Sequence, residues 1–151
     1  MQNKNIWYGN PTLQEFEWMM HTGNIGAVLD IKFEELGDDY LVATMPVDER
    51  TRQPFGILHG GASVVLAETL GSVASLLCVD RETFIGVGLE INANHIKAVA
   101  SGRVKGICKP LHIGGRTHVW DIKIYNSHEE LVCVSRFTSA VVAKNKLPIN
   151  Q

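Results

Sequence analysis

The stretch from Gly61 to Leu77 constrains the fold most, because it is apolar on nearly every side of a helix. A helix of this kind is buried in a core instead of lying on a surface. One acid, Glu68, stands in the middle of it. An unpaired carboxylate in such a place costs several kcal/mol unless it is hydrogen-bonded or neutralised. Glu68 therefore either faces water or has a chemical role.

Small and polar residues share one side of this helix with Glu68. At about 100° per residue, Gly61, Gly71, Ser72 and Ser75 fall in the same stripe, and Ser72 lies one turn after Glu68. The stripe fits the solvent-facing side of an amphipathic helix on which glycine and serine let another backbone cross closely. It fits equally well an access path beside a reactive carboxylate.

The residues that precede the helix favour the second interpretation. Gln53 supplies an amide, and His59, Gly60 and Gly61 place an imidazole and unhindered backbone N–H groups at the helix N-terminus. N–H groups at this position stabilise negative charge that develops on an oxygen. The helix N-terminus is therefore a candidate oxyanion site.

The segments around the helix indicate strands. Trp120, Ile122 and Ile124 alternate with polar residues, which is the period of a half-buried antiparallel strand. Two strands are predicted before the helix as a hairpin, and four after it, between glycine-rich or polar turns; their ranges are 28–36, 39–47, 83–95, 102–113, 117–126 and 130–143.

At the N-terminus, Thr12 and Glu15 fit a capping box that would open a short helix from Leu13 to His21. The order of elements predicts one α+β domain in which a single helix packs on an antiparallel sheet. Residues 1–10 and 144–151 are expected to be loose termini.

Composition excludes several classes of protein. The 14 basic and 16 acidic residues are interspersed, which argues against nucleic acid as a partner. The N-terminus lacks the apolar core of a signal peptide, so a soluble, cytoplasmic protein without membrane attachment is expected. The three cysteines are widely spaced in apolar segments, which indicates reduced core residues and neither a disulfide framework nor a metal site; they are Cys78, Cys108 and Cys133.

The motif QPFGILHGG followed by LAE resembles that of hotdog-fold acyl-CoA thioesterases. MPVDERTRQPFG, GLEINANH and GICKPLHIG resemble the branch that contains the 1,4-dihydroxy-2-naphthoyl-CoA and enterobactin proofreading thioesterases, over roughly Gly37 to Ala143. The resemblance implies an antiparallel sheet wrapped around one long helix. It also implies hydrolysis of acyl-CoA thioesters without a cofactor, by homodimers with shared active sites that often pair into tetramers.

The resemblance also implies roles for the motif residues. Glu68 would act as general base on water or as nucleophile, and Ser72 would help to hold the water. The Gln53 side chain and the Gly60 N–H would stabilise the oxyanion. His59 would touch the thioester or acyl group, although a histidine that only bonds to backbone at the helix entry is an alternative.

Substrate-binding residues are implied on the later strands. His95 would reach the hydroxyl of an aromatic acyl group, with a strand-end surface histidine as the alternative, and Gly88 on the same strand and His112 are further candidates. The turn Gly114, Gly115 and Arg116 would hold the phosphates of coenzyme A, with nearby Lys97 and Lys109 in support; a glycine-rich turn with a solvated arginine is the plain alternative.

Two other classes of function remain as rivals. A hotdog hydratase or dehydratase would need a histidine and an aspartate as an acid–base pair, and no such pair stands at the matching positions. A non-catalytic acyl-CoA-binding module could dispense with Glu68.

One geometric argument predicts a site shared between two chains. Gly60 and Glu68 are eight residues apart, or about 12 Å along a helix. A reacting carbonyl needs its oxyanion donor and its base within about 6 to 8 Å of each other. Two antiparallel helices related by a two-fold axis would bring the donor of one chain to the base of the other.

Overall fold

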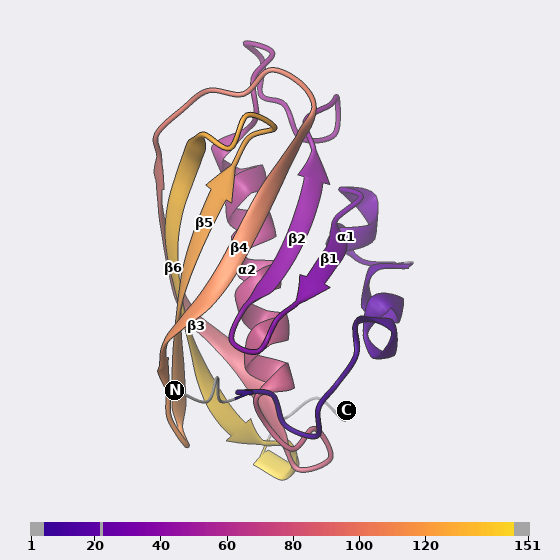
Figure 1. Ribbon diagram of the computed structural model, residues 1–151, viewed down its shortest axis with the longest axis vertical. Coiled ribbons are helices and arrows are strands. Elements are labelled where there is room, and N and C mark those ends of the chain that lie inside the picture. Colours follow the sequence, from indigo (N-terminus) through magenta and orange to yellow (C-terminus); the bar gives the residue numbers. More distant parts are fainter. Residues whose placement is uncertain (1–4, 22, 147–151) are drawn as a thin grey trace.

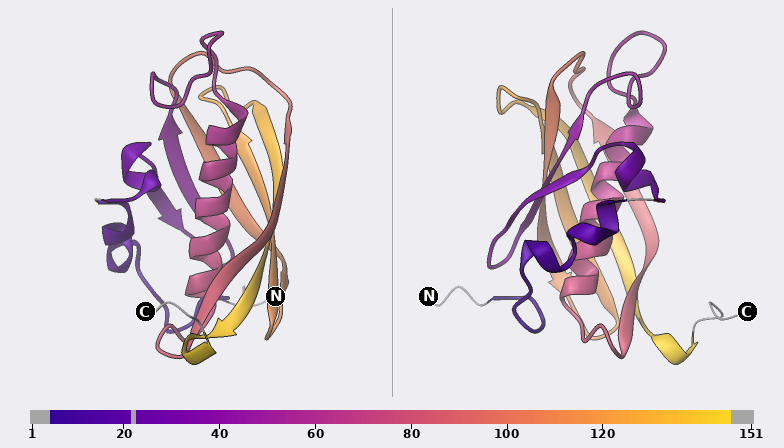
Figure 2. Two further views of the ribbon diagram at one scale, coloured as in Figure 1. Left: turned by 180° about the vertical axis from the view of Figure 1, so that it is seen from behind. Right: turned by 90° about the vertical axis from the view of Figure 1, so that its right-hand side faces the viewer.

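The computed structural model describes residues 5–21 and 23–146 of the 151-residue chain. Six strands within these residues form one antiparallel sheet in the order β1-β2-β4-β5-β6-β3, and the sheet curves around one long helix, α2 (Figures 1 and 2). The predicted α+β architecture is confirmed. The elements around the helix are β1 (Lys32–Leu36), β2 (Leu41–Pro46), α2 (Gly60–Leu77), β3 (Phe84–His95), β4 (Arg103–Ile113), β5 (Thr117–Tyr125) and β6 (Leu131–Ala143).

The first strand begins later than the sequence pattern indicated. A four-residue helix, α1 (Ile25–Val28), and the turn that follows it occupy the start of the expected strand. The Asn24 side chain caps this helix by accepting from the Ala27 N–H at 3.0 Å. Asp30 then has a φ of 52°, in the left-handed region that turns the chain. Strand β1 can therefore begin only at Lys32.

The N-terminal helix predicted from Leu13 to His21 is wrong. Two short 3₁₀ segments replace it, η1 (Leu13–Glu15) and η2 (Glu17–Met20), and the Thr12 side chain makes no capping hydrogen bond. Phe16 lies between them, fully buried, with its ring edge-on to that of Phe33 at 5.3 Å. Packing of this ring against β1 outweighs the weak local preference for a continuous helix.

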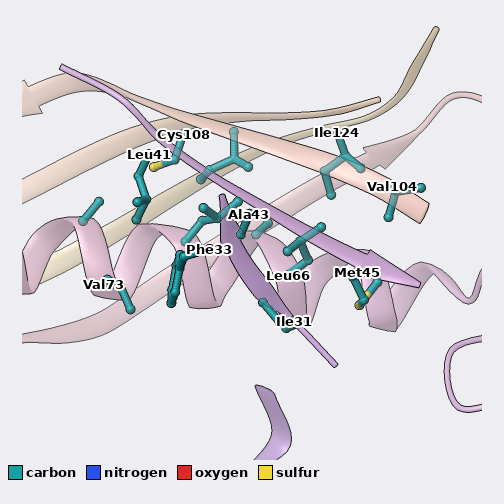
Figure 3. Packing of buried hydrophobic residues seen from close by; sticks show 14 of the residues in the cluster. Ile31, Phe33, Leu41, Ala43, Met45, Leu66, Val73, Val104, Cys108 and Ile124 are labelled. Atoms are coloured by element: carbon teal, nitrogen blue, oxygen red, sulfur yellow. The ribbon is translucent and has the colours of Figure 1, made fainter. Parts of the chain in front are cut away.

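Helix α2 forms the centre of the core. By length and composition it could cross a membrane, but more than half of it is buried within the fold. Its inner side packs on strands β2 to β6. Figure 3 shows Val73 of α2 near Phe33, and Leu66 nearer to Met45. The helix is not covered all round as its composition indicated, because Val64, Val65 and Leu76 are only partly buried.

Two residues of the predicted stripe face the sheet and not the open side of α2. A Cβ on Gly71 would lie 2.3 Å from the ring of Phe137 on β6. Ser75 accepts a hydrogen bond from the Trp120 indole at 2.8 Å and shares another with Ser139 at 2.7 Å. Gly71 and Ser75 thus allow close packing inside the domain, and the idea that they leave room beside Glu68 is wrong.

The cysteines lie where the sequence predicted. Cys108 and Cys133 are buried and Cys78 is partly buried, and none of the three forms a disulfide. Burial raises the pKa of the Cys78 thiol to about 12, so this thiol is not a nucleophile at neutral pH.

The two edges of the sheet differ. Strand β1 has five residues with an irregularity between Phe33 and Glu35, and the segments η1 and η2 lie against it. Strand β3 has twelve residues and pairs with β6 on one side only. It contains a β-bulge at Leu89, whose side chain is 64% exposed.

Candidate active site

Glu68 lies on the partly open side of α2 and faces β3. An added Cβ on Gly88 would lie 2.7 Å from Glu68 Oε1, so the carboxylate occupies the space that a side chain on this strand would take. Burial raises the pKa of the Glu68 carboxyl above its ordinary value. Within the described residues Glu68 has no hydrogen-bond or ion-pair partner. It is thus a partly desolvated carboxylate that is available to take a proton.

Gly88 was expected among the substrate-binding residues. Its place in the structure is beside Glu68 and the Phe137 ring, which an added Cβ would approach to 3.2 Å. The absence of a side chain at Gly88 lets the carboxylate approach the strand closely.

The N-terminus of α2 carries one backbone N–H without an acceptor. His59 N–H donates to Thr51 O at 2.8 Å, Gly61 N–H to His59 Nδ1 at 2.8 Å and Ala62 N–H to His59 O at 3.0 Å. In the described part of the chain the Gly60 N–H donates to nothing. Gly60 is therefore the group at this helix end that remains free to bind an oxygen.

A cleft of about 270 Å³ brings three of the predicted residues together: Gln53, Gly60 and His95. The His95 ring lies directly over Gly60, since an added Cβ there would approach its Nε2 to 2.7 Å. Ser63, which is buried, also lines the cleft and was not singled out from the sequence, although its position one turn after Gly60 was a usable signal.

His59 has a structural task at the end of the helix. Its Nδ1 accepts from the Gly61 N–H and so caps α2. It lines a neighbouring cleft of about 420 Å³ with Arg50, Arg52 and Val65, and it is not among the residues that line the Gln53 cleft. Within one chain, His59 therefore makes the contacts of the alternative, a helix-entry histidine bonded to backbone.

The remaining predicted residues lie elsewhere. Glu68 and Ser72 are two and three turns along α2 and do not line the Gln53 cleft. The turn with Gly114, Gly115 and Arg116 joins β4 to β5 at the end of the molecule opposite the N-terminus of α2 (Figure 1). Its Gly114 lies against the His112 ring, at 2.6 Å from Nε2 to an added Cβ.

The two lysines expected near this turn contact other parts of the molecule. Lys97 Nζ pairs with Glu130 at 2.5 Å beside the Gln53 cleft. Lys109 Nζ lies 5.6 Å from the centre of the Tyr40 ring, next to β2. Arg116 is therefore the basic side chain of the turn itself.

Within the described residues, no group of three His, Cys, Asp or Glu side chains lies close enough together to hold a metal ion.

Known proteins with similar sequences and structures show the family of this chain. Residues 55–133 match the family model described as "Thioesterase superfamily". This chain belongs to the thioesterase superfamily. Over 137 residues the thioesterase is 56% identical to the 1,4-dihydroxy-2-naphthoyl-CoA hydrolase of Escherichia coli, an alignment that covers 91% of this chain and 99% of that protein.

Two further relatives bear on the fold and the activity. The thioesterase is 47% identical to the proofreading thioesterase EntH of Cronobacter turicensis, over 91% of this chain and 98% of that protein. It superposes with a TM-score of 0.88 on the crystal structure of a mutant of thioesterase PA1618 from Pseudomonas aeruginosa, with 48% identity and coverage of 91% and 99%. The predicted hotdog fold and the predicted class of enzyme, a thioester hydrolase, are confirmed.

Proposed function

We propose that this thioesterase hydrolyses acyl-CoA thioesters with a hydroxylated aromatic acyl group, and that 1,4-dihydroxy-2-naphthoyl-CoA, in cytoplasmic menaquinone synthesis, is its substrate. The 56% identity to a hydrolase of that compound, over nearly the whole of both chains, supports the choice. The observation that carries the chemistry is the partly buried Glu68 carboxylate, which has no partner among the described residues.

In the proposed reaction Glu68 takes a proton from a water molecule, which Ser72 helps to hold, and the resulting hydroxide attacks the thioester carbonyl carbon. The Gly60 N–H and the Gln53 NH₂ group stabilise the oxyanion. The C–S bond then breaks, and the thiolate of coenzyme A takes the proton from Glu68. Direct attack by the Glu68 carboxylate, with hydrolysis of the resulting anhydride, is the second route. Neither route requires a metal or an organic cofactor.

The site is proposed to form between two chains. Gly60 and Glu68 lie eight residues apart on one continuous helix, about 12 Å along its axis. The long unpaired edge of β3, which lies beside Glu68, is a suitable surface for a two-fold partner. Antiparallel helices would then place the cleft of one chain near Glu68 of the other.

This arrangement also gives a role to the remaining residues. The turn with Arg116 lies at the opposite end of the molecule from the cleft, so a two-fold partner would bring its own Arg116 turn to the same end as the cleft. There Gly114, Gly115 and Arg116 would bind the phosphates of coenzyme A, and His112 would support the turn. His59 and His95 would contact the acyl end, and two dimers would pair into a tetramer.

Thiol release from a panel of acyl-CoA thioesters, followed with a disulfide reagent, tests the proposal. Glu68→Gln should lower turnover by orders of magnitude without loss of fold stability, because the amide keeps the shape and lacks the basicity. Near-normal hydrolysis by this variant would refute the assignment. A kcat/KM for 1,4-dihydroxy-2-naphthoyl-CoA no higher than for hexanoyl-CoA would refute the choice of substrate.

A mixture of Glu68→Gln and Gln53→Ala chains tests the shared site. Random pairing of the two inactive variants gives hybrid dimers with one intact site, so about a quarter of the wild-type activity should return. No recovery after verified subunit exchange would contradict the shared site.

A second candidate substrate is a misacylated carrier protein. The 47% identity to a proofreading thioesterase supports it. Comparison of kcat/KM for the same acyl group on coenzyme A and on a carrier protein would decide between the two.

A further inference from the structure

A tight turn follows Gln53. The Gly56 N–H donates to Gln53 O at 2.9 Å, and the Gln53 N–H donates to Ile57 O at 2.8 Å. Gly56 has a φ of 80°, a conformation that glycine adopts without steric cost. A bridge between Arg52 and Leu58 closes the base of the turn. The backbone around Gln53 is thus fixed on both sides.

The turn also holds the Gln53 side chain. The Phe55 N–H donates to Gln53 Oε1 at 2.6 Å. Because the carboxamide is planar, a fixed oxygen also fixes the direction of its NH₂ group, and a flip of the amide would break the bond. The NH₂ group has no acceptor among the described residues. Gln53 lines the same cleft as Gly60, whose N–H is also unused.

We propose that the backbone N–H of Phe55 is a positioning group that holds the Gln53 amide so that NH₂, and not the carbonyl oxygen, meets the substrate. This inference rests on the proposed function. A flipped amide would present an oxygen lone pair to the developing oxyanion and would repel it. A held amide needs no reorganisation during the reaction, which is the condition under which such donors are effective.

The Phe55 side chain is separable from this role. Its ring is 90% exposed and does not line the cleft. Phe55→Ala removes the ring and keeps the N–H, whereas Phe55→Pro removes both. The comparison of these two variants isolates the N–H donor, and any contribution of the ring cancels.

The test is a double-mutant cycle on thiol release. Loss of one oxyanion donor lowers kcat by about 10²- to 10³-fold. When the Gln53 amide is present but no longer held, kcat should fall by a smaller factor, about 10-fold. We expect kcat of Phe55→Pro to be about 10-fold below that of Phe55→Ala, with KM changed less than twofold. In chains that also carry Gln53→Ala, the same comparison should give less than a twofold difference.

Gln53→Glu supplies an independent arm. Glutamate keeps an oxygen that can accept from the Phe55 N–H, but it replaces NH₂ by a second oxygen, so activity should fall at least as far as in Gln53→Ala. Thermal melting of each variant reports whether the fold is kept.

Two results would overturn the inference while the proposed function stands. One is a kcat for Phe55→Pro equal to that of Phe55→Ala. The other is an equal fall in kcat from Phe55→Ala to Phe55→Pro in chains that keep Gln53 and in chains that carry Gln53→Ala. This result would show that proline acts on the turn or on the fold and not through the Gln53 amide. A wild-type chain that releases no thiol from any acyl-CoA would instead overturn the proposed function, and this inference with it.

Discussion

Replacement of Gly88 by alanine tests whether β3 sets the position of the Glu68 carboxylate. The new Cβ would lie 2.7 Å from Glu68 Oε1, whereas ordinary contact begins at 3.4 Å. The carboxylate would therefore have to move by about 0.7 Å. It lies at the end of a flexible side chain, so we expect it to move while the fold stays intact.

A displacement of this size should be costly for catalysis. A misplacement of about 1 Å can lower a rate by about 10²-fold, so about 0.7 Å should lower kcat by about 10- to 10²-fold. The new Cβ would also approach the buried Phe137 ring to 3.2 Å, so the free energy of unfolding should fall by about 1 kcal/mol, at the lower end of the cost of overpacking. Thiol release gives kcat and KM, and urea denaturation gives the stability.

Gly86→Ala is the matched control. Gly86 is on the same strand, and its added Cβ would approach Ser75 Cβ of α2 to 2.9 Å, away from the carboxylate. Overpacking of this kind costs about 1–3 kcal/mol, so this variant should lose stability and keep its kcat. If Gly88→Ala keeps wild-type kcat, or loses no more of it than Gly86→Ala does, the reasoning about Glu68 is refuted.

Three further predictions concern acidity and packing. Because burial raises the pKa of Glu68, the acid limb of the kcat/KM profile should lie above pH 4.5, the ordinary value of a glutamate. A raised pKa in the folded state also means that the ionised carboxylate lowers the stability of the fold as the pH rises. Glu68→Gln should therefore not lower the melting temperature at neutral pH. Gly71→Ala, whose Cβ would lie 2.3 Å from Phe137, should lose about 1–3 kcal/mol in urea denaturation. Arg103→Met removes the bond to Asp30 that lowers the pKa of that carboxyl. Because both side chains are about one-third exposed, the free energy of unfolding should fall by less than about 1 kcal/mol. This difference between variant and wild type should diminish as the pH falls through the Asp30 pKa.

The sheet and its central helix were predictable because their patterns are strong. Alternation at Trp120, Ile122 and Ile124 is a signal of period two, and each of these side chains is fully buried. The N-terminal helix failed because a pattern of apolar residues does not tell what a ring such as Phe16 will pack against. The short helix α1 was missed for a related reason, since four residues give no periodicity.

The candidate site was predictable in its residue types but not in its contacts. Projection of α2 gives the angle of each side chain, but not which side another element covers. Ser75 and Gly71 therefore looked like neighbours of Glu68 although the sheet covers them. In the same way, the sequence shows that Gln53 is present but not that a backbone group two residues later holds its amide.

The unequal edges of the sheet have a consequence for how far assembly can proceed. An open strand edge is a template for another strand, and a sheet with two open edges can grow without end. Here β1 is short, irregular and flanked by η1 and η2, so β3 is the long open edge among the described strands. If two chains pair through their β3 edges as proposed, each chain uses its open edge, and growth of the sheet would stop at two chains. The strand that lies against Glu68 would then also limit polymerisation into fibres.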